Sequence, residues 1–211
     1  MCNRSLLRAR RSAAPLLALA CATLSLNLSG NMIENLIADS KKGMSLMQSA
    51  TLRQGQLTRE EAMQAAAYST SHPDHTAFHL LFALRRDYPD IYTRIPHSSR
   101  ADVLCAALGH VSSLNDWGYL EPEGSLDGEA ATALVEIGQE ALACLRPLLD
   151  DKRSAPLFGS ELATLSTTYD YRRADFAYRY AALILGHEPS FDPDPQVRDN
   201  AIEQLKQDYY P

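Results

Sequence analysis

The stretch Ala133–Asp151, ALVEIGQEALACLRPLLDD, decides the fold expected for this chain. Its first part, ending at Ile137, has apolar residues three and four positions apart, as one buried helical face requires. Gly138 follows directly, and glycine commonly ends helices. Gln139–Leu149 repeats the apolar spacing, and Pro147 near its end is expected to bend that helix. The stretch therefore predicts two short amphipathic helices joined by a tight turn.

Helices of this length need neighbours, because helix nucleation is unfavourable and each has only a few apolar residues to bury. Similar patterns recur along the chain, and no segment alternates with period two for long enough to propose a sheet. The expected helices are Arg59–Ser69, Asp74–Tyr88, Ser98 or Ser99 to Val111, Leu126–Ile137, Gln139–Leu149, Tyr171–Gly186 and Asp192–Gln207. The chain is predicted to be all-α.

The ends of these helices are marked by capping residues and prolines. Thr58 and Glu61 have the spacing of a capping box. Ser71 and Pro73 mark the next start, since proline is tolerated at the first helical position. The last helix has Pro195 at its start, and its inner face is expected to hold Val197, Ala201, Ile202 and Leu205.

Small and large apolar residues, closed by Ile or Leu and then Gly, recur in this series. They are found at Ala133-Leu134…Ile137-Gly138 and Ala181-Ala182…Leu185-Gly186, with a fainter echo at Ala107-Leu108-Gly109…Val111. Asp194-Pro195-Gln196-Val197-Arg198…Ala201 looks like the Asp-Pro-x-Val-Arg-x-x-Ala opening of a helical repeat. On these residues, Ser99–Gln207 resembles HEAT and HEAT-like (phycobilisome-lyase-type) repeat proteins. The resemblance implies an irregular α-solenoid-like stack of short antiparallel helix pairs, used for protein–protein contact rather than catalysis.

Residues 1–30 have a different composition from the rest. Their arginines precede an uncharged run, Ser12–Leu28, and no acidic residue occurs before Glu34. This is the arrangement of a secretory signal peptide, and Ala18-Leu19-Ala20 before Cys21 resembles a bacterial lipoprotein cleavage site with Cys21 as the lipidated residue. We predict export to the periplasm, the envelope or the outside, with membrane attachment only through the N-terminus. A mitochondrial transit peptide and an uncleaved anchor are the alternatives.

The remaining chain is divided into a lead-in and one domain. Residues 31–56 are polar and expected to be flexible, and residues 57–211 are expected to form a single helical domain. The net charge of −6 argues against a nucleic-acid binder. Cys105 and Cys144 stand among apolar residues at helical spacing. Export would permit a disulfide between them, and two buried free thiols are the alternative.

Residues 72–79, HPDHTAFH, offer a metal site. His75 and His79 are four residues apart, so on a helix their rings would share one face, and Asp74 or His72 would supply a third ligand. The carboxylate of a His-Glu-x-x-His motif is missing. A metal-binding protein or metal-dependent enzyme using these residues is therefore the alternative hypothesis, against ordinary structural or surface histidines.

The segment Thr168–Tyr180, TYDYRRADFAYRY, offers an interaction surface, because tyrosine and arginine are enriched where proteins meet. The alternative is that two of the tyrosines fill the core while the arginines pair with Asp170 and Asp175. The predicted surface consists of Tyr169, Tyr171, Arg172, Arg173, Tyr178 and Arg179.

Catalytic motifs are lacking in the remaining sequence. It has no Gly-x-Ser-x-Gly elbow and no cysteine in a matched histidine context. Paired carboxylates such as Glu60-Glu61 have the pattern of solvated helix ends. We therefore expect an exported helical-repeat protein that binds a protein partner as an interaction or scaffold module, without catalysis or a cofactor.

Overall fold

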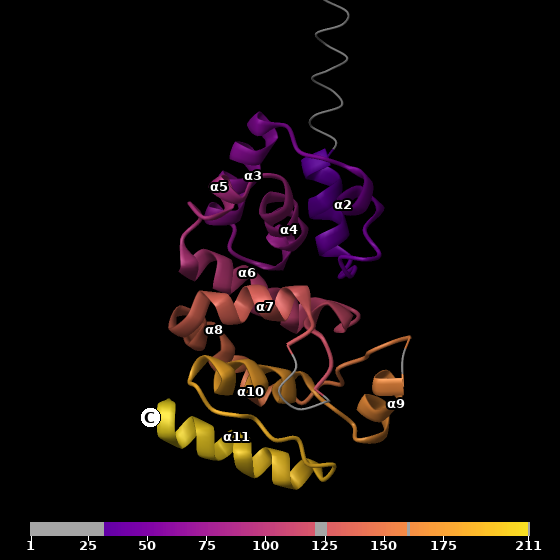
Figure 1. The fold of residues 1–211 in the computed structure, drawn as a ribbon, viewed down its shortest axis with the longest axis vertical. Helices are drawn as coiled ribbons and strands as arrows, with labels where there is room; N and C mark the ends of the chain where they lie inside the picture. The colour runs from indigo at the N-terminus through magenta and orange to yellow at the C-terminus, as the bar shows by residue number, and fades with distance from the viewer. Residues whose placement is uncertain (1–31, 121–125, 160, 211) are drawn as a thin grey trace, which may run out of the picture.

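The computed structural model describes residues 32–120, 126–159 and 161–210. Within these ranges the chain is all-α, as predicted, and the one β-type pairing is an isolated bridge between Ser154 and Arg172. The helices follow one another along the long axis of the molecule, from the N-terminal group at one end to α11 at the other (Figure 1). The predicted signal peptide and Cys21 lie outside the described residues.

The N-terminal group is built around α3 and α4, which pack against each other. It contains a helix over residues 32–41, α2 (Ala50–Gln54), α3 (Arg59–Ser71), the 3₁₀ turn η1 (His75–Ala77), α4 (Phe78–Asp87) and α5 (Pro89–Tyr92). The predicted capping box is confirmed. Thr58 Oγ1 accepts a hydrogen bond from the Glu61 amide, and the Glu61 carboxylate accepts one from the Thr58 amide at 2.8 Å.

The remaining elements continue the stack beneath α3 and α4. They are α6 (His97–His110), η2 (Asn115–Trp117), α7 (Glu129–Ile137), η3 (Gly138–Ala141), α8 (Leu142–Leu145), η4 (Arg146–Asp150), α9 (Glu161–Thr168), α10 (Arg173–Ile184) and α11 (Pro195–Tyr209). Gly138 ends α7 with a φ of 77°, a conformation that suits glycine, as predicted. The single helix predicted for Gln139–Leu149 is wrong. That stretch is divided between η3, α8 and η4, and Pro147 lies in η4, where its missing N–H cannot continue an α-helical ladder.

Aromatic side chains connect the layers at the centre of the core. Trp117 is 1% exposed, and its ring lies 6.4 Å from that of Phe78 in α4 and 5.8 Å from that of Tyr180 in α10. Tyr180 also donates a hydrogen bond from its hydroxyl to the Trp117 carbonyl at 2.6 Å. The short η2 turn therefore joins α4 to α10, although residues 88–172, which are 85 residues, separate those helices in the sequence.

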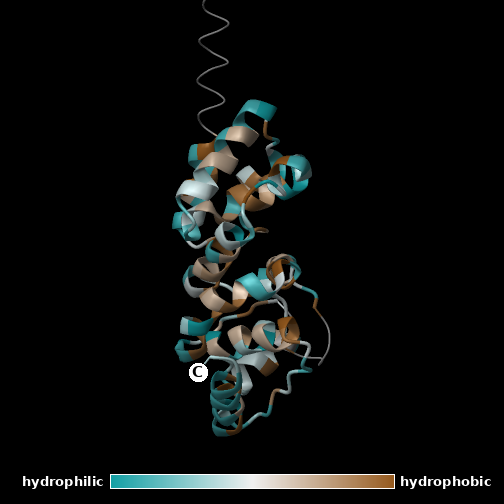
Figure 2. Ribbon diagram, turned by 90° about the vertical axis from the view of Figure 1, so that its left-hand side faces the viewer, coloured by the Kyte–Doolittle hydropathy of each residue, from teal (hydrophilic) through white to brown (hydrophobic). Residues whose placement is uncertain are grey.

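Two expectations about buried residues are wrong. The lead-in over residues 31–56 is not a flexible tail from residue 32 onward, because Leu36, Leu46 and Leu52 are buried against the body and Ser49 caps α2. Val197 is 46% exposed instead of facing inward, because α11 closes the stack and only one of its sides is covered. Figure 2 shows this last helix as largely hydrophilic.

Two helix starts also differ from those expected. The start predicted near Ser71 and Pro73 is displaced, since α3 continues through Ser71 and α4 begins only at Phe78, after η1. Helix α6 begins at His97 without a side-chain cap from Ser98 or Ser99.

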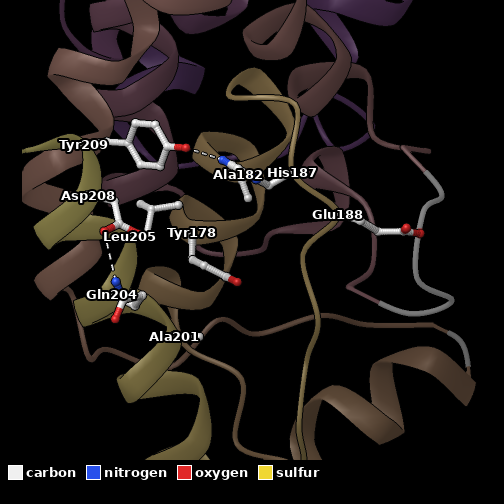
Figure 3. Close-up of a pocket in the computed structure, with 9 residues that line it drawn as sticks. All are labelled: Tyr178, Ala182, His187, Glu188, Ala201, Gln204, Leu205, Asp208 and Tyr209. Carbon is white, nitrogen blue, oxygen red and sulfur yellow. Dashed lines mark hydrogen bonds between the residues drawn. The ribbon is translucent and has the colours of Figure 1, made fainter.

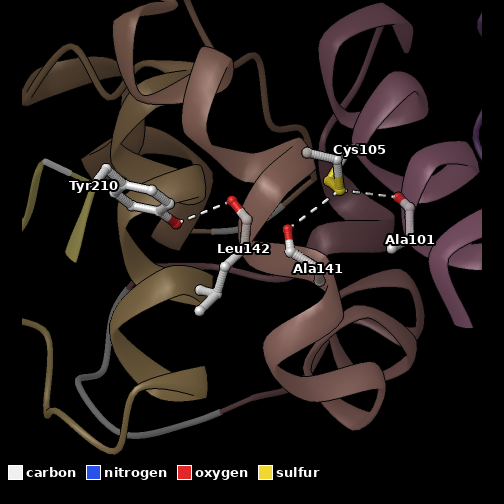
Figure 4. Close-up of a disulfide and its surroundings, with 6 residues drawn as sticks. Ala101, Cys105, Ala141, Leu142 and Tyr210 are labelled. Carbon is white, nitrogen blue, oxygen red and sulfur yellow. Dashed lines mark hydrogen bonds between the residues drawn. A yellow bond between two sulfur atoms is a disulfide. The ribbon is translucent and has the colours of Figure 1, made fainter.

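Cys105 of α6 and Cys144 of α8 form a disulfide, which decides between the two alternatives left open by the sequence. Their Cα atoms are 5.9 Å apart, and 39 residues separate them along the chain. The Cys144 sulfur lies 3.3 Å from the carbonyl oxygens of Ala101 and Ala141 (Figure 4). Since α3 packs on α6 and α10 packs on α8, the disulfide connects the layers that support these two helices.

Candidate functional site

The predicted metal site does not assemble, because His79 is committed to the core. Its side chain has no exposed surface, its Nδ1 lies 2.8 Å from Ser40 Oγ, and its Nε2 lies 3.4 Å from the Ser45 carbonyl oxygen. Burial lowers the pKa of His79 below its usual value, against the opposing effects of the Ser45 carbonyl and Asp39. Both ring nitrogens therefore face protein atoms.

His75 and Asp74 also have structural contacts of their own. His75 lies in η1 rather than in α4, so the helical i, i+4 relation to His79 on which the prediction rested is absent. Its ring stacks on His110 at 3.8 Å, and the Asp74 carboxylate caps η1 by accepting from the Thr76 amide at 2.8 Å. Among the described residues, no three His, Cys, Asp or Glu side chains are grouped to hold a metal ion.

The predicted Tyr/Arg interaction surface is also wrong, because the structure places most of its residues inside. Only Tyr169 and Tyr178 are partly exposed. Arg173 donates to the carbonyls of Leu108 and Val111, which lie at the end of α6, and Arg179 donates to the Tyr119 carbonyl. The buried members are Tyr171, Arg172, Arg173 and Arg179.

The remaining arginine of the segment, Arg172, belongs to a buried ion-pair network. The Arg172 guanidinium contacts the carboxylates of Asp175 and Asp199, each at 2.9 Å. Burial opposes the charge on Arg172, but the hydrogen bonds that its guanidinium donates to the two carboxylates outweigh this effect and raise the pKa of Arg172. The pairing with Asp175 matches the alternative drawn from the sequence.

Arg198 of α11 completes this network and was missed by sequence reasoning. It is 2% exposed, lies 3.3 Å from Asp175, stacks 4.9 Å above the Tyr171 ring and donates to the Tyr169 carbonyl at 2.9 Å. Five N–H donors let one arginine satisfy several loop carbonyls at once. The Tyr/Arg segment is therefore part of the core.

A cavity near the C-terminus lies between α10 and α11 and has a volume of about 320 Å³ (Figure 3). Ala182 of α10 and Ala201 of α11 are among the residues that line it. His187 Nε2 contacts the Tyr209 hydroxyl at one end. The lining mixes acidic, amide and aromatic groups without a concentrated charge or a shared orientation, so the cavity defines no particular ligand.

An apolar groove between α3 and α5 is the more distinctive site, with a volume of about 500 Å³. Ile91 and Ile95 are buried and form its floor, whereas Met63 of α3 lies at its wall and is 57% exposed. The α3/α5 groove is lined by Met63, Ala66, Ala67, Thr70, Ser71, Ile91, Arg94 and Ile95.

The sequence of α3 explains why this groove stays open. The inner face of α3 consists of Ala62, Ala65 and Ser69, which are buried against the body. Ala66 and Ala67 lie on a second face of α3, where their short side chains fill little space. Because α5 has only four residues, it covers only part of that face.

Arg94 is the charged group at this groove. Its side chain is 72% exposed and lies 3.6 Å from Asp90, which Arg59 also contacts at 3.2 Å. Exposed ion pairs of this kind contribute little stability, so Arg94 is free to exchange its partner. This groove is not among the predicted sites, and the clue that the sequence offers is a helix with more apolar residues than one inward face needs.

No protein-family model matches the chain, and no curated protein or solved structure is significantly similar to it. Of the helices in the described ranges, none combines the length and apolar character needed to cross a membrane.

Proposed function

We propose that this chain is a protein-interaction module that binds an amphipathic helix of a partner protein in the α3/α5 groove. The observation that carries the proposal is the exposure of Met63 beside a floor of buried isoleucines. Exposed apolar surface that lines a groove marks binding sites in soluble proteins, and flexible methionines adapt to different partner side chains.

The dimensions of the groove favour a helix as the ligand. Its α3 wall runs from Met63 to Ser71, which corresponds to about two helical turns. Small side chains along this wall, among them Ala66 and Ala67, allow a second helix to approach closely. Helix-in-groove binding uses apolar anchors at positions i, i+3 or i+4 and i+7, which such a groove can receive.

Arg94 specifies the charge expected on the partner. Its guanidinium stands beside the apolar floor, where it can bind a carboxylate next to the partner's apolar anchors. The partner helix is therefore proposed to carry an aspartate or glutamate beside its apolar face.

Export and a repeat-type stack are part of the same proposal. The Cys105–Cys144 disulfide supports an oxidising compartment, because such bonds persist mainly outside the reducing cytosol. The succession of short helix pairs in Figure 1 supports a HEAT-like arrangement, in which binding surfaces lie along stacked helices.

A display selection with amphipathic helical peptides tests the proposal. The library varies the apolar and acidic positions, and binders are then measured against an Ala67→Glu variant. Ala67 is exposed, so this variant keeps the fold and places a carboxylate in the groove. We expect selected peptides to carry an acidic residue beside apolar anchors and to bind Ala67→Glu at least roughly tenfold more weakly.

Gln64→Glu is the matched control, because it adds the same charge to α3 at an exposed position outside the groove. Its affinity for the peptides should equal that of the wild type. Peptides that bind Ala67→Glu and Gln64→Glu equally well would place the contact elsewhere and reject the groove.

A further inference from the structure

A second cavity, with a volume of about 310 Å³, lies among residues of α2, α4, η2 and the start of α7. We call it the Asp116 cavity, and it shares no lining residue with the α3/α5 groove. Leu46, Leu52 and Phe82 are buried and supply its apolar wall. The other residues that line it are Met47, Arg53, Arg86, Asn115, Asp116, Asp127, Gly128 and Glu129.

Three carboxylates line this cavity because the start of α7 lies directly against η2. A Cβ atom on Gly128 would overlap the backbone at the end of η2, so only glycine permits this close approach. Asp127 is held there by the Tyr119 amide, which donates to its Oδ1 at 3.3 Å. Glu129 lies close enough for its charge to act on Asp116. The fold therefore brings like charges together.

Asp116 is the buried member of this group. It is 7% exposed, and its Oδ2 accepts from the Leu46 amide at 2.7 Å. In the part of the chain that the structure describes, its Oδ1 accepts no hydrogen bond and no basic side chain forms an ion pair with it. Burial raises the pKa of Asp116 to about 6, the Leu46 amide opposes this change, and the charge of Glu129 adds to it. A cation in the cavity would offset the cost of ionising this carboxylate.

The two arginines of the cavity do not supply that cation. The Arg86 guanidinium contacts Asp87 at 2.7 Å and donates to the Gly55 carbonyl at 2.6 Å, so its charge is already balanced. Arg53 is exposed, and among the described residues it has no ion-pair partner. The three carboxylates outnumber this unpaired guanidinium, which leaves the cavity with an excess of negative charge.

We propose that the Asp116 cavity binds a small organic amine, with its ammonium group on the Asp116 carboxylate and its apolar body against Leu52 and Phe82. An ammonium group donates charge-assisted hydrogen bonds to a carboxylate, and these are stronger than neutral ones. The described carboxylates are not grouped as metal ligands, which favours an organic cation over a metal ion. The volume lies at the lower end of the range for small-molecule sites, so the ligand is a free amine rather than a larger molecule. Met47 is 73% exposed, and its flexible side chain can adapt to the apolar body.

Calorimetric titration of the protein with phenethylamine tests the proposal. Phenethyl alcohol is the matched neutral compound, because a hydroxyl group replaces the ammonium group on the same ring and chain. At pH 7 the amine should bind at least roughly tenfold more tightly than the alcohol, since only the amine brings a positive charge to Asp116.

Asp116→Asn removes the negative charge and keeps an oxygen that can accept from the Leu46 amide, so this variant should fold. It should bind phenethylamine at least roughly tenfold more weakly than the wild type. Glu60→Gln is the matched control, because it removes a carboxylate from an exposed position of α3 outside the cavity, and it should bind as the wild type does. Arg53→Gln is a second test that does not depend on the fold of the Asp116 variant. Removal of this like charge should strengthen amine binding by roughly threefold.

Acidification from pH 7 to pH 5 provides an independent readout. Phenethylamine stays protonated over this range, whereas Asp116, with its pKa of about 6, takes up a proton. Wild-type affinity should therefore fall by roughly tenfold as the pH is lowered. Asp116→Asn retains the other charged groups of the cavity, which are Arg53, Arg86, Asp127 and Glu129. Its weaker binding should change by less than about twofold over the same range.

Three results would overturn the proposal, namely equal affinities for the amine and the alcohol, no amine binding at millimolar concentration, and wild-type affinity in folded Asp116→Asn. Weakened binding by Arg53→Gln would do the same. An Nα-acetyl-lysine amide that binds more tightly than phenethylamine would also reject a free amine, because it would assign the cavity to a lysine side chain of a protein partner.

Discussion

Helices α3 and α10 have opposite compositions and opposite places in the molecule. Helix α10 belongs to a segment rich in tyrosine and arginine, yet Arg173 and Arg179 are buried in it. Helix α3 is composed largely of alanine and small polar residues, yet it borders the exposed apolar groove. The difference lies in the neighbours, because α10 is packed by η4, α7, α8 and α11, whereas among the described elements the short α5 is the one that borders the groove side of α3.

This comparison shows that the composition of a segment sets how much contact its side chains can make. The position of the segment in the stack decides which groups those side chains contact. Arg179 and Arg198 use their donors on loop carbonyls of their own chain, which satisfies groups that a loop-rich helical protein would otherwise bury unpaired. Ala66 and Ala67 make little contact and therefore leave a groove that a partner can fill.

The largest expected effect concerns the buried ion pairs of α10. Asp175 is 1% exposed and contacts both Arg172 and Arg198. Asp175→Ala leaves these guanidiniums buried without their shared partner, so urea unfolding should show a loss of about 3–5 kcal/mol in the free energy of unfolding. A loss below 1 kcal/mol would mean that the Tyr/Arg segment is a surface after all.

Glu203→Ala provides the control for that experiment. Glu203 is exposed and pairs with Lys206 on α11, at 2.7 Å. Removing such a pair should change the free energy of unfolding by less than about 0.5 kcal/mol.

The next effect concerns the disulfide that joins the layers beneath α3 and α10. Cys105→Ser combined with Cys144→Ser opens a loop of 39 residues, and thermal or urea unfolding should show a loss of about 2–4 kcal/mol. Intact mass before and after alkylation measures the bond directly. Free thiols in the purified protein would contradict the bond.

A smaller effect sharpens the contrast between the two faces of α3. Ala65 is fully buried, so Ala65→Leu should overpack the core and reduce the free energy of unfolding by about 1–3 kcal/mol. Ala67 is exposed in the groove, and Ala67→Leu should change the free energy of unfolding by less than about 0.5 kcal/mol. Equal losses in the two variants would show that the groove is filled.

The smallest effect concerns the start of α3. Thr58→Ala removes the capping hydrogen bond to the Glu61 amide and should reduce the free energy of unfolding by about 1 kcal/mol. The groove should remain, because Thr58 does not line it, and peptide binding should be unchanged. Weakened binding would show that the groove depends on the first turn of α3.

Local patterns predicted the elements well where one residue type has one physical role. Gly138 with its positive φ, the Thr58–Glu61 capping box and the buried face of α7 follow from spacing alone. Spacing also predicted Val197 to be inside, and that prediction is wrong because the end of a stack is not visible in a local pattern.

The site could not be predicted in the same way, because it depends on contacts between distant segments. Nothing near His79 in sequence indicates that Ser40 and Ser45 occupy its ring nitrogens. Likewise, Arg198 reaches Asp175 only after the chain has turned back on itself. The groove is open because α5 is short, and this effect of its length is apparent only when α5 is known to lie beside α3.

Hydroxyl-radical footprinting, with and without a selected helical peptide, tests the central claim most directly. In the free protein Met63 and Tyr209 should be labelled readily, whereas Tyr171 and Tyr180 should be protected, in keeping with their exposure. With peptide bound, labelling of Met63 should fall and that of Tyr209 should stay constant. Rapid labelling of Tyr171 in the free protein, or peptide protection at Tyr178 with Met63 unchanged, would contradict the account.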